Sequence, residues 1–354
     1  MVKERIKKMG HYKPPLEGRA AKDYLLLDFN ERTTSASPKV KEALKKFIDS
    51  DRLQVYPEYG NLEARIAKYA GVKAGEVMVT NGGDQGIDIV CRAHLNGGDR
   101  VIIPFPEFAM HYQAARIQGA EVLEPPYQKE GKLPLDEILK LMDKKGVELI
   151  IFSNPNNPTG IATPISDVEK ILEKAKEKEI AVLHDEAYFE FSKITAKDLI
   201  KKYENLYIIR TFAKAFGLVA ARVGYVISQK NNIQELLKIR GPYDVNTFAK
   251  TAIISALKDT KYMENYVKEV MEKSKPKLEK FLKEKKLVFL PSAGNFLLLK
   301  IENPEKIIYN LKKRGILVRP KEWPDRRKAV RASIGTLKDT ERFIRAFKKI
   351  LTEI

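Results

Sequence analysis

The sequence predicts an α/β protein, in which a mostly parallel sheet of seven strands has helices on both faces and a small α+β domain follows. Three observations support this fold class. Short apolar runs alternate with helical patterns through the middle of the chain. After residue 245 the pattern changes to a long helical stretch and then to mixed strands and helices. The chain has 354 residues, 44% of them hydrophobic, which is enough to bury the cores of two domains.

Seven apolar segments predict the strands of the large sheet, at residues 76–80, 100–103, 121–124, 149–153, 180–184, 206–211 and 222–228. Helical patterns lie between them, for example at 86–94 and 165–178. Functional residues in such folds collect at the carboxyl ends of the strands. Polar motifs follow three of these segments, so we expect one site to form at that edge of the sheet.

The chain is expected to have three parts. Residues 1–37 form an arm, and its strand at 24–28 joins the small domain. Residues 38–245 form the large domain. Residues 246–354 form an interdomain helix and the small domain, with the helix at 247–285, strands at 295–300, 316–319 and 329–334, and further helices at 304–313 and 338–351.

The composition argues against several classes of protein. The net charge is +18, but lysine and glutamate are interleaved, as on a solvated helix face, and no nucleic-acid-binding motif is present. Cys91 is the single cysteine, which excludes an internal disulfide and fits a reducing cytoplasm. The four histidines lack the spacing of metal ligands, so no metal is expected. Neither a signal peptide nor a membrane span of about 18 apolar residues is expected.

Two loop motifs are candidates for binding. Residues 79–86, Val-Thr-Asn-Gly-Gly-Asp-Gln-Gly, lie between a strand and a helix. Glycines there let the backbone approach an anion, and the helix N-terminus offers free N–H groups. Residues 154–160, Asn-Pro-Asn-Asn-Pro-Thr-Gly, form a proline-restricted loop in which the amide of Asn157 can donate a hydrogen bond. An ordinary turn is the alternative reading of each motif.

Lys214 is the most informative single residue. It lies in Thr-Phe-Ala-Lys-Ala-Phe-Gly, residues 211–217, which is too apolar a setting for a typical surface lysine. Asp185 ends a buried strand, where a carboxylate costs free energy unless it is paired or functional, and Tyr188 follows closely. A salt-bridged aspartate and a packed core tyrosine are the alternative interpretations.

Two arginines complete the pattern. Arg222 can pair with a phosphate and Arg331 can hold a carboxylate in a bidentate manner, although surface salt bridges would also explain them. Together with Lys214, these residue types meet the needs of pyridoxal phosphate (PLP). The cofactor requires an amine for its aldehyde, a carboxylate for its ring nitrogen, donors for its phenolate, and cations for its phosphate.

The chain resembles the fold-type I PLP-dependent aminotransferases of the class I and II group, and is most similar to histidinol-phosphate aminotransferases. The resemblance covers nearly the whole length. It rests on segments 27–32, 56–60, 81–85, 154–160, 185–188, 211–217, 291–296, 314–319 and 330–331.

The resemblance implies roles for individual residues. Lys214 would hold PLP and move the substrate proton, and Asp185 would pair with the ring nitrogen. Asn157 and Tyr188 would bind the phenolate oxygen, and Phe108 would stack on the ring. The phosphate would be held by the backbone of the glycine motif and by side chains, at Gly83, Asp84, Gln85 and Arg222.

It also implies how substrate and a second subunit contribute. Arg331, helped by Arg319, would bind the anionic end of the substrate. Tyr12 and Asn30 would line the entrance. Tyr56 would reach the phosphate of the PLP in the other subunit, which implies a homodimer with shared active sites.

Three positions depart from the family pattern. Ala213 replaces the usual serine before the lysine, so one hydroxyl contact to the phosphate is lost, and Thr211 is the residue that would compensate. Phe108 replaces the usual tyrosine and keeps the aromatic face without the hydroxyl. Residues 30–33, Asn-Glu-Arg-Thr, replace the more usual Asn-Glu-Asn-Pro.

The resemblance therefore implies a cytoplasmic transaminase of amino-acid biosynthesis. The preferred amino donor is histidinol phosphate and the acceptor is 2-oxoglutarate, as in histidine biosynthesis. Aromatic amino acids are the alternative donors. A PLP-dependent decarboxylase of a phosphorylated amino acid shares almost all of these motifs. A non-enzymatic PLP-binding regulator would usually carry a DNA-binding domain ahead of this fold, where this chain has only a short arm.

Overall fold

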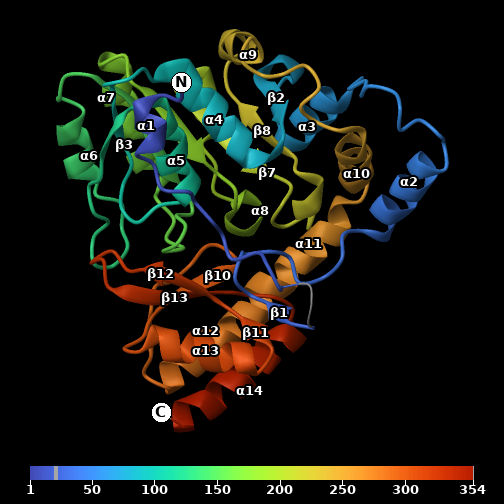
Figure 1. The fold of residues 1–354 in the computed structure, drawn as a ribbon, viewed down its shortest axis with the longest axis vertical. Helices are drawn as coiled ribbons and strands as arrows, with labels where there is room; N and C mark the ends of the chain where they lie inside the picture. Colours follow the sequence, from blue (N-terminus) through green and yellow to red (C-terminus); the bar gives the residue numbers. More distant parts are fainter. Residues whose placement is uncertain (20–22, 354) are drawn as a thin grey trace.

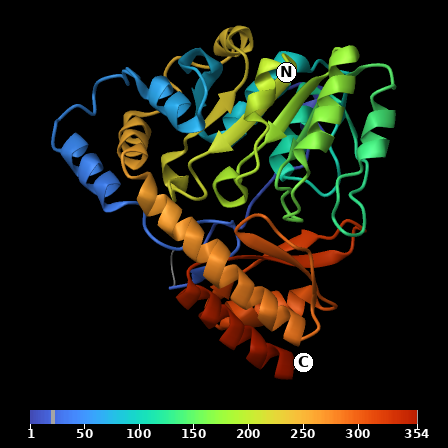
Figure 2. The same ribbon diagram turned by 180° about the vertical axis from the view of Figure 1, so that it is seen from behind.

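The computed structural model describes residues 1–19 and 23–353. Figures 1 and 2 show a large part, in which a central sheet lies between helices, and a smaller part below it that carries the C-terminus. The N-terminal arm runs from the large part to the small one before the chain enters the large sheet (Figure 1).

The large sheet has seven strands in the order β2-β8-β7-β6-β5-β3-β4. β8 is antiparallel to both of its neighbours, and the remaining pairings are parallel. The prediction of an α/β fold with a mostly parallel seven-stranded sheet is therefore confirmed. The strand bounds are β2 (Val77–Thr80), β3 (Arg100–Ile102), β4 (Glu121–Leu123), β5 (Val147–Ser153), β6 (Ala181–Asp185), β7 (Leu206–Thr211) and β8 (Gly224–Ile227).

Both faces of this sheet are buried, because successive residues of a strand point to opposite sides. In β5, Ile150 and Phe152 belong to one apolar cluster, whereas Leu149 and Ile151 belong to another. The first cluster includes residues of α3 (Leu62–Ala70), α6 (Leu135–Leu141), α7 (Ile165–Glu177) and α10 (Thr247–Leu257). The second includes residues of α4 (Gly82–His94), α5 (Ala109–Gln118) and α9 (Lys230–Leu237).

The small part contains a four-stranded antiparallel sheet in the order β12-β13-β10-β9. Its strands are β9 (Val288–Phe289), β10 (Phe296–Lys300), β12 (Arg319–Glu322) and β13 (Lys328–Ser333), accompanied by α12 (Lys275–Glu284), α13 (Pro304–Lys313) and α14 (Leu337–Glu353). β1 (Leu25–Leu26) pairs in parallel with β11 (Ile316–Leu317), which connects the arm to this part. The exact boundaries at residues 37 and 245 stay a prediction.

Two expected elements differ in the structure. The strand expected at 316–319 is divided, because β11 pairs with the arm and the chain then passes to β12 in the other sheet. The helix expected at 247–285 is interrupted between α10 and α11 (Thr260–Glu269), and residues 270–274 form a π-helical turn. The interruption falls at Asp259, whose carboxylate accepts hydrogen bonds from Ser37 and Lys39 near the start of α2 (Pro38–Ile48).

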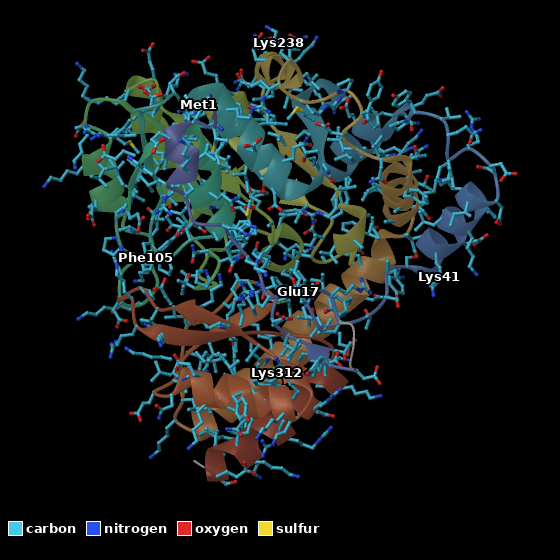
Figure 3. All side chains as sticks on the ribbon, in the orientation of Figure 1. Met1, Glu17, Lys41, Phe105, Lys238 and Lys312 are labelled. Atoms are coloured by element: carbon cyan, nitrogen blue, oxygen red, sulfur yellow. The ribbon has the colours of Figure 1, made fainter. Side chains whose placement is uncertain are left out.

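The positive charge is spread over the molecule. Lys41, Lys238 and Lys312, labelled in Figure 3, are all exposed and lie at three separate helices. This distribution fits the solvated helix faces expected from the sequence. Within residues 1–19 and 23–353, no helix combines the length and the apolar composition that a membrane crossing needs.

Candidate active site

A cavity of about 420 Å³ opens at the carboxyl ends of β5, β6 and β7 and extends to the small sheet. It brings together residues that are far apart in the sequence. Twelve of the fifteen predicted site residues line it: Tyr12, Gly83, Asp84, Phe108, Asn157, Asp185, Tyr188, Thr211, Lys214, Arg222, Arg319 and Arg331.

Lys214 follows β7 and is only partly accessible to solvent. Its Nζ donates a hydrogen bond to the backbone oxygen of Phe29 in the arm, at 2.9 Å. Burial, together with the positive charge of Arg331, lowers the pKa of Lys214 to about 8. Its amine is therefore neutral more often near neutral pH than that of an ordinary lysine, which suits a nucleophile and base.

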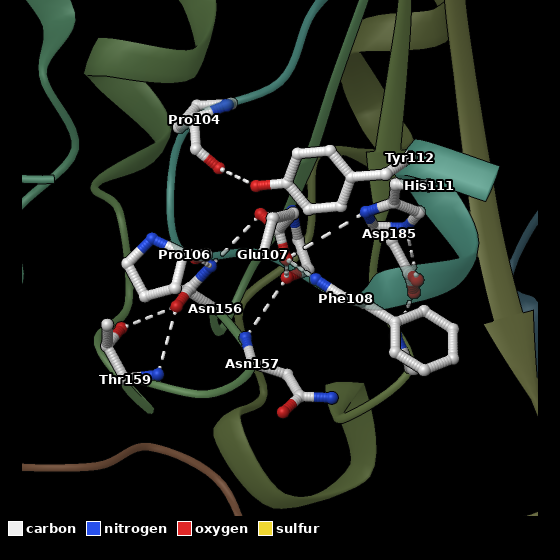
Figure 4. A network of polar contacts seen from close by, with 12 residues as sticks. Pro104, Pro106, Glu107, Phe108, His111, Tyr112, Asn156, Asn157, Thr159 and Asp185 are labelled. Atoms are coloured by element: carbon white, nitrogen blue, oxygen red, sulfur yellow. Dashed lines mark hydrogen bonds and ion pairs between the residues drawn. The ribbon is translucent and has the colours of Figure 1, made fainter. Parts of the chain in front are cut away.

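Asp185 is the last residue of β6 and is held from two sides. Its Oδ1 accepts a hydrogen bond from the backbone N–H of Ala187 at 2.9 Å, and its Oδ2 lies 3.2 Å from Nε2 of His111 (Figure 4). Burial opposes protonation of His111, but the hydrogen bond to Asp185 and the charge of Glu107 outweigh it and raise its pKa. The pair fixes the position of a buried carboxylate at the cavity wall.

His111 was not among the residues predicted from the sequence. It could have been found from its position three residues after Phe108, at the start of the same helix. Helical spacing places these two side chains on one face. Their ring centroids are 5.6 Å apart, in an edge-to-face arrangement. Phe108, which is expected to stack on the ring, and His111, which contacts Asp185, are thus positioned by the start of one helix.

Glu107 was also missed, and it links several polar groups next to Phe108 (Figure 4). Its carboxylate accepts hydrogen bonds from the backbone N–H of Ser153 at 2.9 Å and from Nδ2 of Asn156 at 3.0 Å. It also accepts one from the backbone N–H of Phe108 at 3.0 Å. Burial raises the pKa of Glu107. This buried carboxylate joins the proline-rich loop to the start of the helix that follows Phe108.

The N-terminus of α4 meets Arg222 at one end of the cavity. Gly82 has φ +78°, and a Cβ there would lie 2.6 Å from Nη2 of Arg222. A Cβ at Gly224 would lie 2.6 Å from the backbone nitrogen of Gly83, so glycine is needed where β8 passes this turn. Arg222 pairs with Asp84 at 3.0 Å. Free N–H groups of a first helical turn beside an arginine form a cradle suited to a phosphate.

Thr211 lies beside this cradle, but its hydroxyl is partly used by the backbone. Its Oγ1 accepts a hydrogen bond from the N–H of Ala213 at 3.1 Å. The expectation that Thr211 replaces the hydroxyl missing at Ala213 stays a prediction.

Tyr188, Asn157 and Arg331 form a second polar wall. The Tyr188 hydroxyl accepts a hydrogen bond from Nδ2 of Asn30 at 2.9 Å, and burial raises the pKa of Tyr188 to about 12. Nη1 of Arg331 donates to Oδ1 of Asn157 at 2.6 Å, and its Nη2 donates to the backbone oxygen of Asp28 at 2.6 Å. The amide nitrogen of Asn157 and the Tyr188 hydroxyl remain as donors at this wall.

The small sheet supplies further cationic side chains. Arg319, on β12, is paired in register with Arg331 on β13, and its guanidinium lies 4.7 Å from the ring centroid of Phe29. Lys321 lies two residues further along β12 and also lines the cavity, together with Tyr12 of the arm. Lys321 was not predicted from the sequence, although its spacing of two residues from Arg319 along one strand places both side chains on the same face.

Three predicted site residues do not line the cavity. The Asn30 side chain is buried behind Tyr188. The Gln85 side chain bonds to Asp244 and to the N–H of Asn81. Tyr56 is exposed and stacks on Tyr243, with ring centroids 4.4 Å apart. Asn30 therefore supports a wall residue, while the expected roles of Gln85 and Tyr56 stay predictions.

The residues around the cavity fit PLP. The phosphate cradle of α4 and Arg222, the carboxylate of Asp185, the amine of Lys214 and the face of Phe108 all border one space of suitable size. The fold and this set of groups define an enzyme that uses PLP.

Comparisons with known proteins agree. The profile of the family "Aminotransferase class I and II" matches residues 22–347. The chain belongs to this family. It is 36% identical over 344 residues to a histidinol-phosphate aminotransferase of Geobacillus sp. (strain WCH70), covering 94% of this chain and 91% of the relative. It is 33% identical over 363 residues to the histidinol-phosphate aminotransferase of Staphylococcus carnosus (strain TM300), covering 98% of each.

The same fold occurs in a solved structure. The crystal structure of histidinol-phosphate aminotransferase from Sinorhizobium meliloti, in complex with pyridoxal-5'-phosphate, superposes with a TM-score of 0.89 at 21% identity. The match covers 99% of this chain and 98% of that one. The predictions of a PLP-dependent aminotransferase, with an amino donor and a 2-oxo acid as substrates, are confirmed.

Proposed function

We propose that this enzyme transfers the amino group of histidinol phosphate to 2-oxoglutarate. The observation that carries the proposal is a second cationic group in the cavity, Arg319 and Arg331, in addition to Arg222 at the phosphate cradle. The cradle serves the cofactor, so the second group is available for an anionic end of the amino donor. The names of the relatives support the same donor.

The side chains then have distinct tasks. Bound PLP supplies a ring that withdraws electrons from the amino donor and makes its α-proton acidic. Nζ of Lys214 removes this proton, because burial keeps the amine partly neutral. Asp185, which His111 contacts, would hold a proton on the ring nitrogen of the bound cofactor. Tyr188 and Asn157 donate to the ring oxygen, and Arg331 and Arg319 orient the donor.

A homodimer in the cytoplasm is part of the proposal. Several large apolar side chains are exposed on one region of the large part, around α2 and the start of α10: Ile48, Leu53, Val55, Tyr56, Tyr243 and Phe248. Such a group is unusual on the free surface of a monomer and suits a second copy of the chain. Cys91 is buried as a free thiol, in keeping with a reducing compartment. Sedimentation at equilibrium should give twice the chain mass.

The direct test is the visible absorption spectrum of the PLP-loaded enzyme. Histidinol phosphate, added without any oxo acid, should convert the band of the lysine-bound cofactor to that of its amine form. An unchanged band would contradict this donor. Phenylalanine and tyrosine are then the donors to test by the same conversion. Release of carbon dioxide from a phosphorylated amino acid would instead identify a decarboxylase.

A further inference from the structure

One edge strand presents two cations to the cavity. Along β12, Arg319 and Lys321 are partly buried, whereas Pro320 and Glu322 are exposed. This alternation places both basic side chains on one face of the strand. In Figure 1, β12 and β13 form the edge of the small part that faces the large one. Arg331 on β13 lines the same cavity, which gives three cations at its wall.

The carboxylates nearby do not neutralise this trio. Asp28 and Glu31 both pair with Arg19 of the arm. Glu322 lies on the opposite face of β12. Glu107 is occupied by the Ser153 and Asn156 donors described above. The three cations therefore stand as an excess of positive charge facing the cavity.

Each of the two arginines also has a buried N–H donor without a hydrogen-bond partner among the described residues. Nε of Arg331 and Nη1 of Arg319 are buried, and no hydrogen-bond partner for them exists within the described part of the chain. Burial and the charges of Arg331 and Arg319 lower the pKa of Lys321 to about 7. Unpaired buried donors and adjacent like charges both cost free energy, and a bound anion would relieve both costs.

The number of cations distinguishes two kinds of anion. A carboxylate carries one negative charge and is satisfied by one bidentate arginine. A phosphate monoester carries a charge of about −1.5 to −2 near pH 7 and has three strong acceptor oxygens. Three cations match the charge of a phosphate monoester and exceed what a carboxylate needs.

We propose that Lys321 is a specificity residue, which joins Arg319 and Arg331 in binding a phosphate monoester on the amino donor and favours it over a carboxylate. This inference rests on the proposed function and extends it by one residue. Lys321 touches the anionic end of the donor and takes no part in proton transfer.

Kinetics of three variants of the PLP-loaded enzyme test the proposal. Lys321→Gln should raise KM for histidinol phosphate by about tenfold, the effect of losing one charged hydrogen bond, and should change kcat by less than about threefold. Lys321→Arg should retain most of the affinity. Lys328→Gln is the matched control, because Lys328 is exposed on the neighbouring strand and pairs with Glu305. An unchanged KM in Lys321→Gln would overturn the proposal.

A binding measurement separates this proposal from the choice of donor. Inorganic phosphate, titrated calorimetrically into the PLP-loaded enzyme, should bind wild type and Lys328→Gln alike, and Lys321→Gln at least fivefold more weakly. If this holds while histidinol phosphate is not converted, the donor assignment fails and Lys321 still marks a phosphate subsite. If histidinol phosphate is converted but phosphate binding does not depend on Lys321, the Lys321 proposal fails and the donor assignment stands.

Discussion

Nε2 of His111 lies 3.2 Å from Oδ2 of Asp185, and both side chains are shielded from solvent. Nδ1 of the same imidazole lies 3.8 Å from Glu107. The carboxylate expected to face the ring nitrogen is thus oriented by an imidazole whose pKa is raised by the hydrogen bond to Asp185 and by the charge of Glu107. His111 acts through Asp185 and is a positioning residue.

His111→Gln should lower kcat by about 10- to 100-fold, because a displaced Asp185 no longer matches the ring nitrogen. It should also shift the absorption maximum of the bound cofactor, which a purely structural role would not do. His94→Gln is the control, since His94 packs on Tyr207 away from the cavity. Equal losses of kcat in both variants would contradict a specific role for His111.

The stability of the protein should depend on pH through the same histidine. The pKa of His111 is raised above its ordinary value of 6.5. Its contribution is therefore complete below about pH 6.5 and is lost as the pH rises through the raised value. The difference in Tm between wild type and His111→Gln should shrink between pH 6 and pH 9. A difference that grows over this range would show that His111 is buried in its neutral form.

Attachment of the cofactor to Lys214 should accelerate as pH rises towards 8. Only the neutral amine attacks the aldehyde, and the pKa of Lys214 is about 8. Below this value the rate should fall about tenfold per pH unit, as followed by absorbance after PLP is mixed with the apoenzyme. If the midpoint of the curve of attachment rate against pH lay near 10.5, burial would not lower the pKa of this amine. Lys214→Ala should abolish both attachment and transamination.

Gly82→Ala should weaken retention of PLP by about tenfold or more. A side chain there combines an unfavourable positive φ with a collision against Arg222. Gly98→Ala is the control, because Gly98 has φ +98° and a Cβ there would meet no atom within 4 Å. Dialysis followed by absorbance measures the retained cofactor. Equal losses in both variants would indicate backbone strain alone.

Arg210→Met should destabilise the protein by about 3–5 kcal/mol, because it leaves a buried carboxylate without its cation. Nη2 of Arg210 lies 2.8 Å from Glu186, and both side chains are buried. The double variant with Glu186→Gln should recover part of this loss. Urea unfolding monitored by circular dichroism gives the free energies, and the absence of any recovery would contradict the pairing.

The sequence predicted the parts of the molecule that depend on local pattern. All seven strands of the large sheet have apolar runs with turn residues at their ends, and three of the strands end at polar motifs. The interruption at Asp259 was not predictable from helical periodicity, because it depends on contacts with Ser37 and Lys39, more than 200 residues earlier. Long-range partners of this kind leave no signal in a local pattern.

In the candidate site, too, residues in distinctive local motifs were predicted and residues defined by long-range contacts were not. Lys214, Asp185 and Arg222 belong to motifs with a distinctive local composition. His111 and Glu107 were missed because a buried histidine and a buried glutamate look like ordinary surface residues until the helix is placed against β5 and β6. Lys321 is one of many lysines in a chain with 65 basic residues, and only its strand face singles it out.

The pairing of β12 with β13 has a consequence for how this enzyme can change over time. The residues expected to face the cofactor lie mainly at the ends of the large-sheet strands, whereas the three cations proposed to meet the amino donor lie on one hairpin, residues 319–331. Substitutions within that hairpin can alter the preferred donor while the cofactor-binding residues stay as they are. A lineage can thus acquire a new substrate through a few neighbouring codons, with the chemical step inherited intact.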